Sequence, residues 1–250
     1  MFKYVYHLAL AILLFCMNVV FGQSKTTALS HFDKVIVSPH IEVTFKEGNK
    51  ESITIDNARL PEEKINIEVS GKTLHIYLDG AKMITKTKKK HHENGWKQKQ
   101  PIYKGTMITA TVTYKDLSEL SIRGEEVITC ESPILREDFK LKVYGESKIT
   151  MNKLTVNALY VTMYGESLLE IREGKVGRQK YTIYGEGEIN TLGMDNENTK
   201  ITAYGEANLR VNVSEHLKVS AFGEATVVYN GNPSVQKGII IGEATIQKID

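Results

Sequence analysis

The chain has 250 residues, of which 41% are apolar and only five are proline, enough for one sizeable domain or two small ones. Its formal charge is +2 at pH 7, and loss of a leader that contains Lys3 would leave +1. With Cys16 inside that leader, Cys130 stands alone, which excludes an internal disulfide framework. We interpret Cys130 as a small core residue, in preference to a reactive thiol or an intermolecular bridge.

The first 22 residues have the pattern of a secretion signal. Lys3 gives a short basic start and residues 8–15 form an apolar run, with cleavage expected before Gln23. A transmembrane anchor is the weaker alternative, because the apolar run falls short of ~20 residues. We therefore expect an exported protein of the periplasm, the outer-membrane surface or the exterior, without a membrane span in the mature chain.

The next part of the chain predicts an N-terminal β layer over residues 31–122. Alternating apolar residues and turn signals indicate a strand pair broken near Pro39 and further strands downstream. These strands cover 32–45, 52–56, 65–78 and 108–112. We expect this layer to close one end of a coil formed by residues 123–250, within one continuous domain over 31–250.

A strongly basic loop interrupts the layer at residues 82–104. It holds eight lysines and one glutamate, a net +7, which leaves −6 on the rest of the mature chain. The residues proposed to bind an anion are Lys86, Lys88, Lys89, Lys90, Trp96, Lys97 and Lys99. Such a loop could hold an anionic glycan, a lipid head group or a nucleic acid without sequence preference, with aromatic rings for stacking. The alternative is a solvated hairpin that only keeps the protein soluble. The adjacent His91 and His92 lack the partners of a defined metal site.

A glycine–glutamate pair recurs through the second half of the chain. The pairs are Gly124-Glu125, Gly145-Glu146, Gly165-Glu166, Gly185-Glu186, Gly205-Glu206, Gly223-Glu224 and Gly242-Glu243. Successive glycines are 21, 20, 20, 20, 18 and 19 residues apart. A period of about 20 residues is typical of a solenoid, because each unit is too short to bury its own apolar face.

Alternation around each pair predicts which side chains face inward. In residues 141–149 every second residue is apolar or small, which indicates a strand with one buried face. Stacking in register would place the glycines in one inward column, at a bend or a close backbone approach from across the coil. A second inward column contains Ser147, Ser167, Gly187, Ala207, Ala225 and Ala244. The aromatic residues and glutamates would then face outward, on rungs ~4.8 Å apart.

These outward columns form the candidate binding surface. Its residues are Tyr144, Glu146, Tyr164, Glu166, Tyr184, Glu186, Tyr204 and Glu206. Carboxylates on adjacent rungs would repel by about 1 kcal/mol per pair in water. Nearby cations such as Lys142, tyrosine hydroxyls, protonation or a divalent cation could relieve the repulsion. The chain lacks the Gly-Gly-x-Gly-x-Asp pattern of calcium-binding coils, and we predict neither a metal nor a cofactor. Ordinary surface stacking without a ligand is the alternative.

The chain shows no pattern of a catalytic site. Seven equivalent glutamates are a property of the repeat, whereas glycoside hydrolysis needs two carboxyl groups that differ in pKa. Gly-x-Ser-x-Gly, His-Glu-x-x-His and P-loop motifs are missing from the sequence. We therefore predict a protein that is not an enzyme.

The repeats and their flanks resemble the head GIN domain family over roughly 31–250. The resemblance rests on the start at residues 32–37, the end at 228–233 and the closest repeat copy, Tyr184-Gly185-Glu186-Gly187-Glu188-Ile189. Where this family has small serines, the chain has tyrosine and glutamate. The resemblance implies a single-stranded, right-handed parallel β-helix in a secreted or envelope protein of the autotransporter adhesin-head type. The family supplies no catalytic residues.

Two functions follow. The first is a non-catalytic adhesion or interaction module of the cell envelope that binds a glycan or another envelope protein. Stacked aromatic rings would suit this function as a flat contact surface for sugars. The second is a carbohydrate-active β-helix, a lyase or glycosidase with an unrecognised site. The oligomeric state stays open.

Overall fold

The computed structural model describes residues 25–91 and 97–249. The predicted leader and Trp96 lie outside these residues. Within them, no helix is long and apolar enough to span a bilayer.

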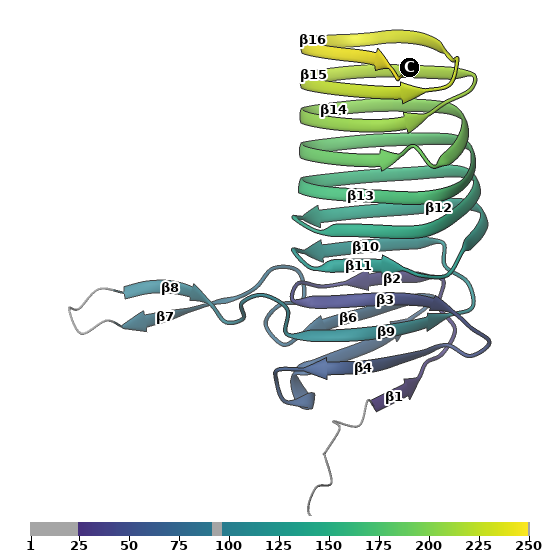
Figure 1. The fold of residues 1–250 in the computed structure, drawn as a ribbon. Coiled ribbons are helices and arrows are strands. Elements are labelled where there is room, and N and C mark those ends of the chain that lie inside the picture. The colour runs from purple at the N-terminus through teal and green to yellow at the C-terminus, as the bar shows by residue number, and fades with distance from the viewer. Residues whose placement is uncertain (1–24, 92–96, 250) are drawn as a thin grey trace, which may run out of the picture.

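The second half of the chain winds into a stack of parallel β rungs (Figure 1). Its strands are β10 (Glu119–Gly124), β11 (Val127–Cys130), β12 (Ile134–Gly145), β13 (Lys148–Thr191), β14 (Met194–Asn212), β15 (His216–Asn230) and β16 (Ser234–Lys248). Each strand pairs in parallel with the next turn of the coil, so that Gly185, Gly205 and Gly223 lie in one column. This arrangement confirms the predicted parallel β-helix and its period.

Parallel stacking begins before residue 123. β2 (Lys34–Val37) pairs with β10 and with β6 (Thr73–Leu78), while β3 (Ile41–Glu47) pairs with β11 and with β9 (Ile108–Tyr114). Three strands close this end of the coil in antiparallel orientation. They are β1 (Lys25–Ala28), β4 (Ser52–Ala58) and β5 (Ile65–Ser70). A short 3₁₀ turn, Glu62–Lys64, precedes β5.

The basic segment forms a separate hairpin that projects sideways from the coil (Figure 1). Its strands are β7 (Thr87–His91) and β8 (Lys97–Pro101), which among the described residues pair only with each other. We call this hairpin the basic arm.

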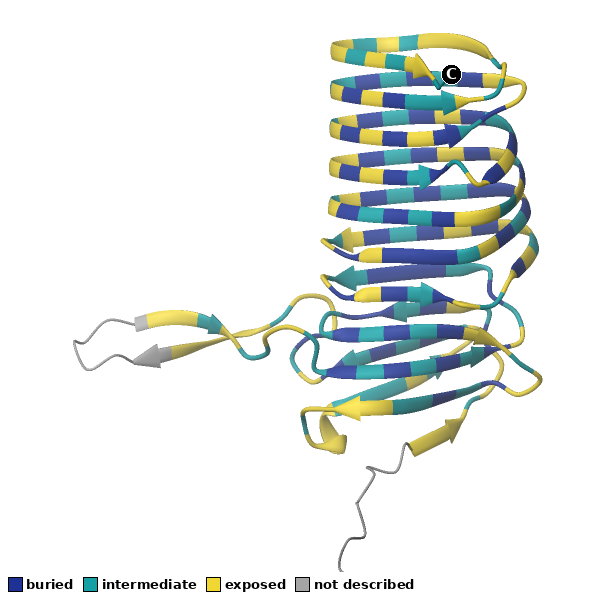
Figure 2. Ribbon diagram, in the orientation of Figure 1, coloured by how far each residue is buried: buried dark blue, intermediate teal, exposed yellow. Residues whose placement is uncertain are grey.

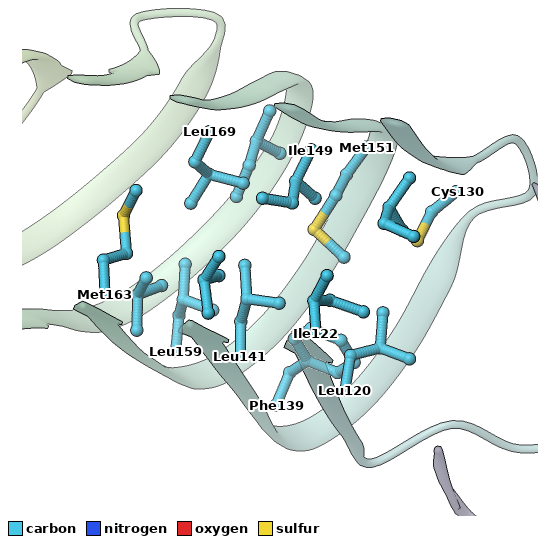
Figure 3. Packing of buried hydrophobic residues seen from close by; sticks show 14 of the residues in the cluster. Leu120, Ile122, Cys130, Phe139, Leu141, Ile149, Met151, Leu159, Met163 and Leu169 are labelled. Atoms are coloured by element: carbon cyan, nitrogen blue, oxygen red, sulfur yellow. The ribbon is translucent and has the colours of Figure 1, made fainter. Parts of the chain in front are cut away.

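Alternation builds the core as the sequence predicts. Leu141, Val143 and Ile149 are buried while Tyr144 and Glu146 are exposed, and similar stripes recur on the rungs up to β15 (Figure 2). Residues of the wall before the glycine corner face residues of the wall after it (Figure 3). The labelled residues are Leu120, Ile122, Phe139, Leu141, Leu159 and Met163 against Cys130, Ile149, Met151 and Leu169. Burial of such a continuous apolar column is the main source of stability.

The expected inward column of glycines is wrong. Gly145 and Gly165 lie at the corner between the two walls with φ values of +124° and +106°. A Cβ on Gly165 would point along the coil at the carbonyl oxygen of Gly145, only 2.4 Å away. The bend that we expected is present, but the close approach comes from the neighbouring rung, not from across the coil.

Candidate functional site

The outward aromatic residues form one continuous stack along the coil. Ring centroids are 5.1 Å apart for Tyr144 and Tyr164, 4.7 Å for Tyr164 and Tyr184, and 4.8 Å for both remaining steps up to Phe222. Neighbouring ring planes differ by 2° to 8°. The spacing follows the rung spacing, because each ring occupies the same register position on its strand. We call this column the tyrosine ladder.

The ladder exposes ring edges, not ring faces. Parallel stacking turns each inner ring face toward its neighbour, and Tyr164 and Tyr184 are 40% and 37% exposed. A ligand alongside the ladder therefore meets C–H edges and phenolic hydroxyls. At the lower end of the ladder, the guanidinium of Arg123 lies over the outer face of Tyr144, with its carbon 5.9 Å from the ring centroid.

The glutamate column runs beside the ladder and is exposed to solvent. Glu186, Glu206, Glu224 and Glu243 occupy matching positions on successive rungs. Lys142, which the sequence suggested as a counter-charge, pairs instead with Glu119 at 2.6 Å. The hydrogen bond that Lys142 donates to Glu119 raises the pKa of Lys142 above its ordinary value.

A shallow hollow of about 250 Å³ accompanies the column. Its lining includes Glu166, Glu186 and Glu206 together with Ser167 and Asn208. Within residues 25–91 and 97–249, no group of three or more His, Cys, Asp or Glu side chains is arranged to hold a metal ion. The hollow offers carboxylates, an amide and a hydroxyl, which are hydrogen-bonding groups for a polar ligand.

A larger pocket of about 570 Å³ lies at the lower end of the ladder. It is bounded by Tyr144 and Arg123 of the coil and by Met83 and Ile84 at the base of the basic arm. Met83 and Ile84 are 60% and 80% exposed. The arm thus leaves the coil beside the foot of the ladder, so the two candidate surfaces adjoin.

The floor of this pocket carries a histidine and a buried carboxylate that our sequence analysis missed. His40 Nδ1 lies 3.8 Å from Glu126 Oε1, and the Glu126 side chain is 6% exposed. Glu126 also accepts a hydrogen bond of 3.0 Å from the backbone N–H of Glu125. His40 has a φ of +73°, and its ring bonds the Gly105 carbonyl and the Thr85 hydroxyl.

A local signal could have revealed Glu126. In later rungs the second residue after the glycine is small, as in Ser147 and Ser167, whereas the first rung places a glutamate there. A charged residue in a predicted inward column is unusual, because a buried charge requires partners. Its partner His40 is 86 residues away in sequence and carries no comparable signal.

The basic arm presents exposed lysines on paired strands. Lys88 and Lys89 on β7 and Lys99 on β8 are exposed, as is Lys86 just before β7. Lys89 lies directly opposite Lys99 in the antiparallel register. Like charges directly opposite destabilise a strand pair, so an anion between them would stabilise the arm. The side chains of Lys90 and Lys97 lie outside the part of the chain whose side chains are described, as does Trp96.

A family comparison now identifies the chain. The model of putative auto-transporter adhesins with a head GIN domain matches residues 31–233. The chain belongs to the head GIN domain family. A comparison of this head GIN domain protein with curated sequences finds no match.

Solved structures share the fold. A putative adhesin of Bacteroides fragilis NCTC 9343 has a TM-score of 0.71 at 17% identity, covering 90% of this chain and 96% of that chain. A putative adhesin and a putative lipid binding protein of Parabacteroides distasonis ATCC 8503 have TM-scores of 0.62 and 0.61 at 19% and 18% identity. Both alignments cover 91% of this chain and 96% of the other. Neither the family description nor the names of these solved structures refer to an enzyme.

Proposed function

We propose that this head GIN domain protein is a non-catalytic interaction module of the cell envelope whose tyrosine ladder and glutamate column bind a neutral glycan chain. The single observation that supports this function is the repeat of hydroxyls and carboxylates along one straight, exposed face. Carboxylates accept paired hydrogen bonds, and vicinal sugar hydroxyls donate them. An acidic column disfavours an anionic polymer, which is why we propose a neutral one.

The ladder would bind the edges of sugars through hydrogen bonds along its length. The outer face of Tyr144, next to the 570 Å³ pocket, is covered by Arg123, so the ladder would contact a sugar through ring edges and hydroxyls and not by ring stacking. Weak contacts repeated along a polymer add up through multivalency, so long chains should bind far better than oligosaccharides.

A panel of immobilised neutral polysaccharides tests this function. The Glu166→Gln/Glu186→Gln variant should lose at least roughly tenfold in affinity, because two of the carboxylates that bind hydroxyls become weaker acceptors. Glu173→Gln is the matched control, because Glu173 is exposed on the coil outside the column. Equal binding by all three proteins would contradict the proposal. Release of cleaved sugar would favour the alternative function, a lyase or glycosidase.

The arm supports a second candidate function, which is attachment to an anionic surface. The opposed Lys89 and Lys99 are the observation that favours it. The Lys88→Gln/Lys89→Gln/Lys99→Gln variant should elute from heparin at clearly lower salt than the wild type, because each lost phosphate or sulfate contact reduces the salt dependence. The matched control changes Lys148, Lys180 and Lys200, which are exposed on the coil, to glutamine. If both variants elute together, the arm has no specific role.

A further inference from the structure

The strand at the C-terminal end of the coil has one unpaired edge. Within residues 25–91 and 97–249, β16 pairs only with β15. The opposite end differs, because the antiparallel strands β4 and β5 cover it. An open strand edge displays unpaired N–H and C=O groups and accepts a further strand readily.

The core is also open at this end. Ile240, Ala244 and Ile246 pack against the core but are only partly buried, whereas Leu217 and Val219 one rung below are 0% exposed. Figure 2 shows this change as the loss of dark blue positions in the last rung. A further layer over β16 would remove this apolar surface from water.

The exposed strand is self-complementary in sequence. Residues 237–243 read Lys-Gly-Ile-Ile-Ile-Gly-Glu, which is the same in both directions except that a lysine faces a glutamate at the ends. The backbone departs from a regular strand on both sides of Ile240. A bulge at residues 238–239 precedes it, and a bend at Gly242, with φ of +113°, follows it.

We propose that two copies of the chain join end to end by antiparallel pairing of their β16 strands about a two-fold axis at Ile240. Ile240 would then lie opposite its counterpart, and Ile239 opposite Ile241 of the second copy. Directly opposite residues point to the same side of a sheet, so the partly buried Ile240 pair joins the two cores. Ile239 and Ile241 are 62% and 63% exposed, and in the dimer Ile239 of each copy would cover Ile241 of the other on the outer side.

The charged residues at the two ends of this segment favour a second copy of the chain as the partner of β16. In this register Lys237 of each copy lies opposite Glu243 of the other, and both residues are exposed. A strand of unrelated sequence would meet a lysine at one end and a glutamate at the other without matching charges. A parallel alignment of two β16 strands would instead place like charges together, which destabilises the pair.

Charge reversal tests this pairing. The dimer dissociation constant of the chain without its predicted leader can be measured by analytical ultracentrifugation. Glu243→Lys places like charges at two positions of each dimer, and we expect the constant to rise roughly tenfold. Adding Lys237→Glu should restore it. Glu224→Lys, in the same column one rung below, is the matched control and should leave the constant unchanged.

Cross-linking tests the register. Ile240→Cys places one thiol on each side of the proposed axis, whereas Thr245→Cys does not meet its counterpart. Only the first variant should oxidise to a disulfide-linked dimer, because opposite residues have the Cβ separation that a disulfide needs. The native Cys130 is buried and does not compete. A wild type that stays monomeric at all concentrations, or equal cross-linking of both variants, would overturn the proposal.

Discussion

The carbonyl oxygen of Gly145 lies so close to Gly165 that a methyl group on Gly165 would be 2.4 Å from it. The φ of Gly165, +106°, lies in a region of backbone conformation that residues other than glycine rarely adopt. Two independent constraints thus exclude any side chain at this corner. The same contact recurs between Gly185 and Gly205, at 2.5 Å. The glycine of each repeat is therefore required by the tight corner that connects the two walls.

Gly165→Ala should lower the free energy of unfolding by roughly 2–4 kcal/mol, since backbone strain adds to a clash with a neighbouring backbone. Gly71→Ala is the control, because Gly71 has a φ of +59° but open space around its Cα. It should cost about 1–2 kcal/mol from strain alone. Chemical denaturation of both variants measures the difference, and equal losses would show that the contact between rungs is unimportant.

The glutamate column should cost stability at low salt. Matching carboxylates on neighbouring rungs repel one another, so Glu186→Gln should stabilise the protein by about 0.5 kcal/mol. At 1 M salt the gain should vanish, because the screening length falls to about 3 Å. Glu173→Gln, which removes the partner of Lys153 at 3.3 Å, should bring no gain at either salt concentration. Thermal melting at two ionic strengths makes this comparison.

The parity of the repeat could be predicted from sequence because it depends on local alternation alone. Counting alternate residues along one strand is enough to predict that Tyr144 points outward and Val143 inward. The predicted inward position of the glycines was wrong because counting along the strand assumes that the strand is straight. A positive φ instead turns Gly145 toward the rung below. Local patterns indicate which face a residue occupies, and they do not reveal contacts along the stack.

The polar groups inside the coil show the same limit. Gln179 and Tyr181 are buried in the core, and their hydrogen-bond partners could not be derived from the alternation. Tyr181 donates to Gln179 Oε1 at 2.7 Å, and Gln179 Nε2 donates to Thr199 at 2.9 Å. The pocket floor of His40 and Glu126 likewise joins segments that are distant in sequence. These arrangements depend on how the rungs stack, which the period alone does not determine.

Cys130 should not react with alkylating reagents in the native protein. Its side chain is 1% exposed, and burial raises the pKa of the thiol to about 12. The thiolate is the reactive form, so iodoacetamide at pH 8 should label Cys130 only after unfolding. Mass spectrometry with and without denaturant measures the labelling. Rapid labelling of the folded chain would contradict the core position of this residue.

His75 should make the protein less stable as the pH falls below neutrality. Its Nε2 lies 2.9 Å from the Ser38 hydroxyl, which itself donates to the Lys82 carbonyl. Burial lowers the pKa of His75 below its ordinary value of 6.5, and the positive charges of Lys82 and Arg123 lower it further, against a smaller opposing effect of Glu68. The neutral ring is therefore the form that fits the fold.

The direction of the pH effect follows from proton linkage. Because the folded pKa is lower than the unfolded pKa, the unfolded chain binds more protons as the pH falls below about 6.5. The stability that His75 contributes is complete above this pH and is lost as the pH falls through the lowered pKa. His75→Gln should flatten this part of the stability profile, and Lys82→Gln should flatten it partly by raising the pKa of His75. Urea unfolding from pH 8 to pH 5 measures the slopes, and an unchanged slope in His75→Gln would assign the pH dependence to other groups.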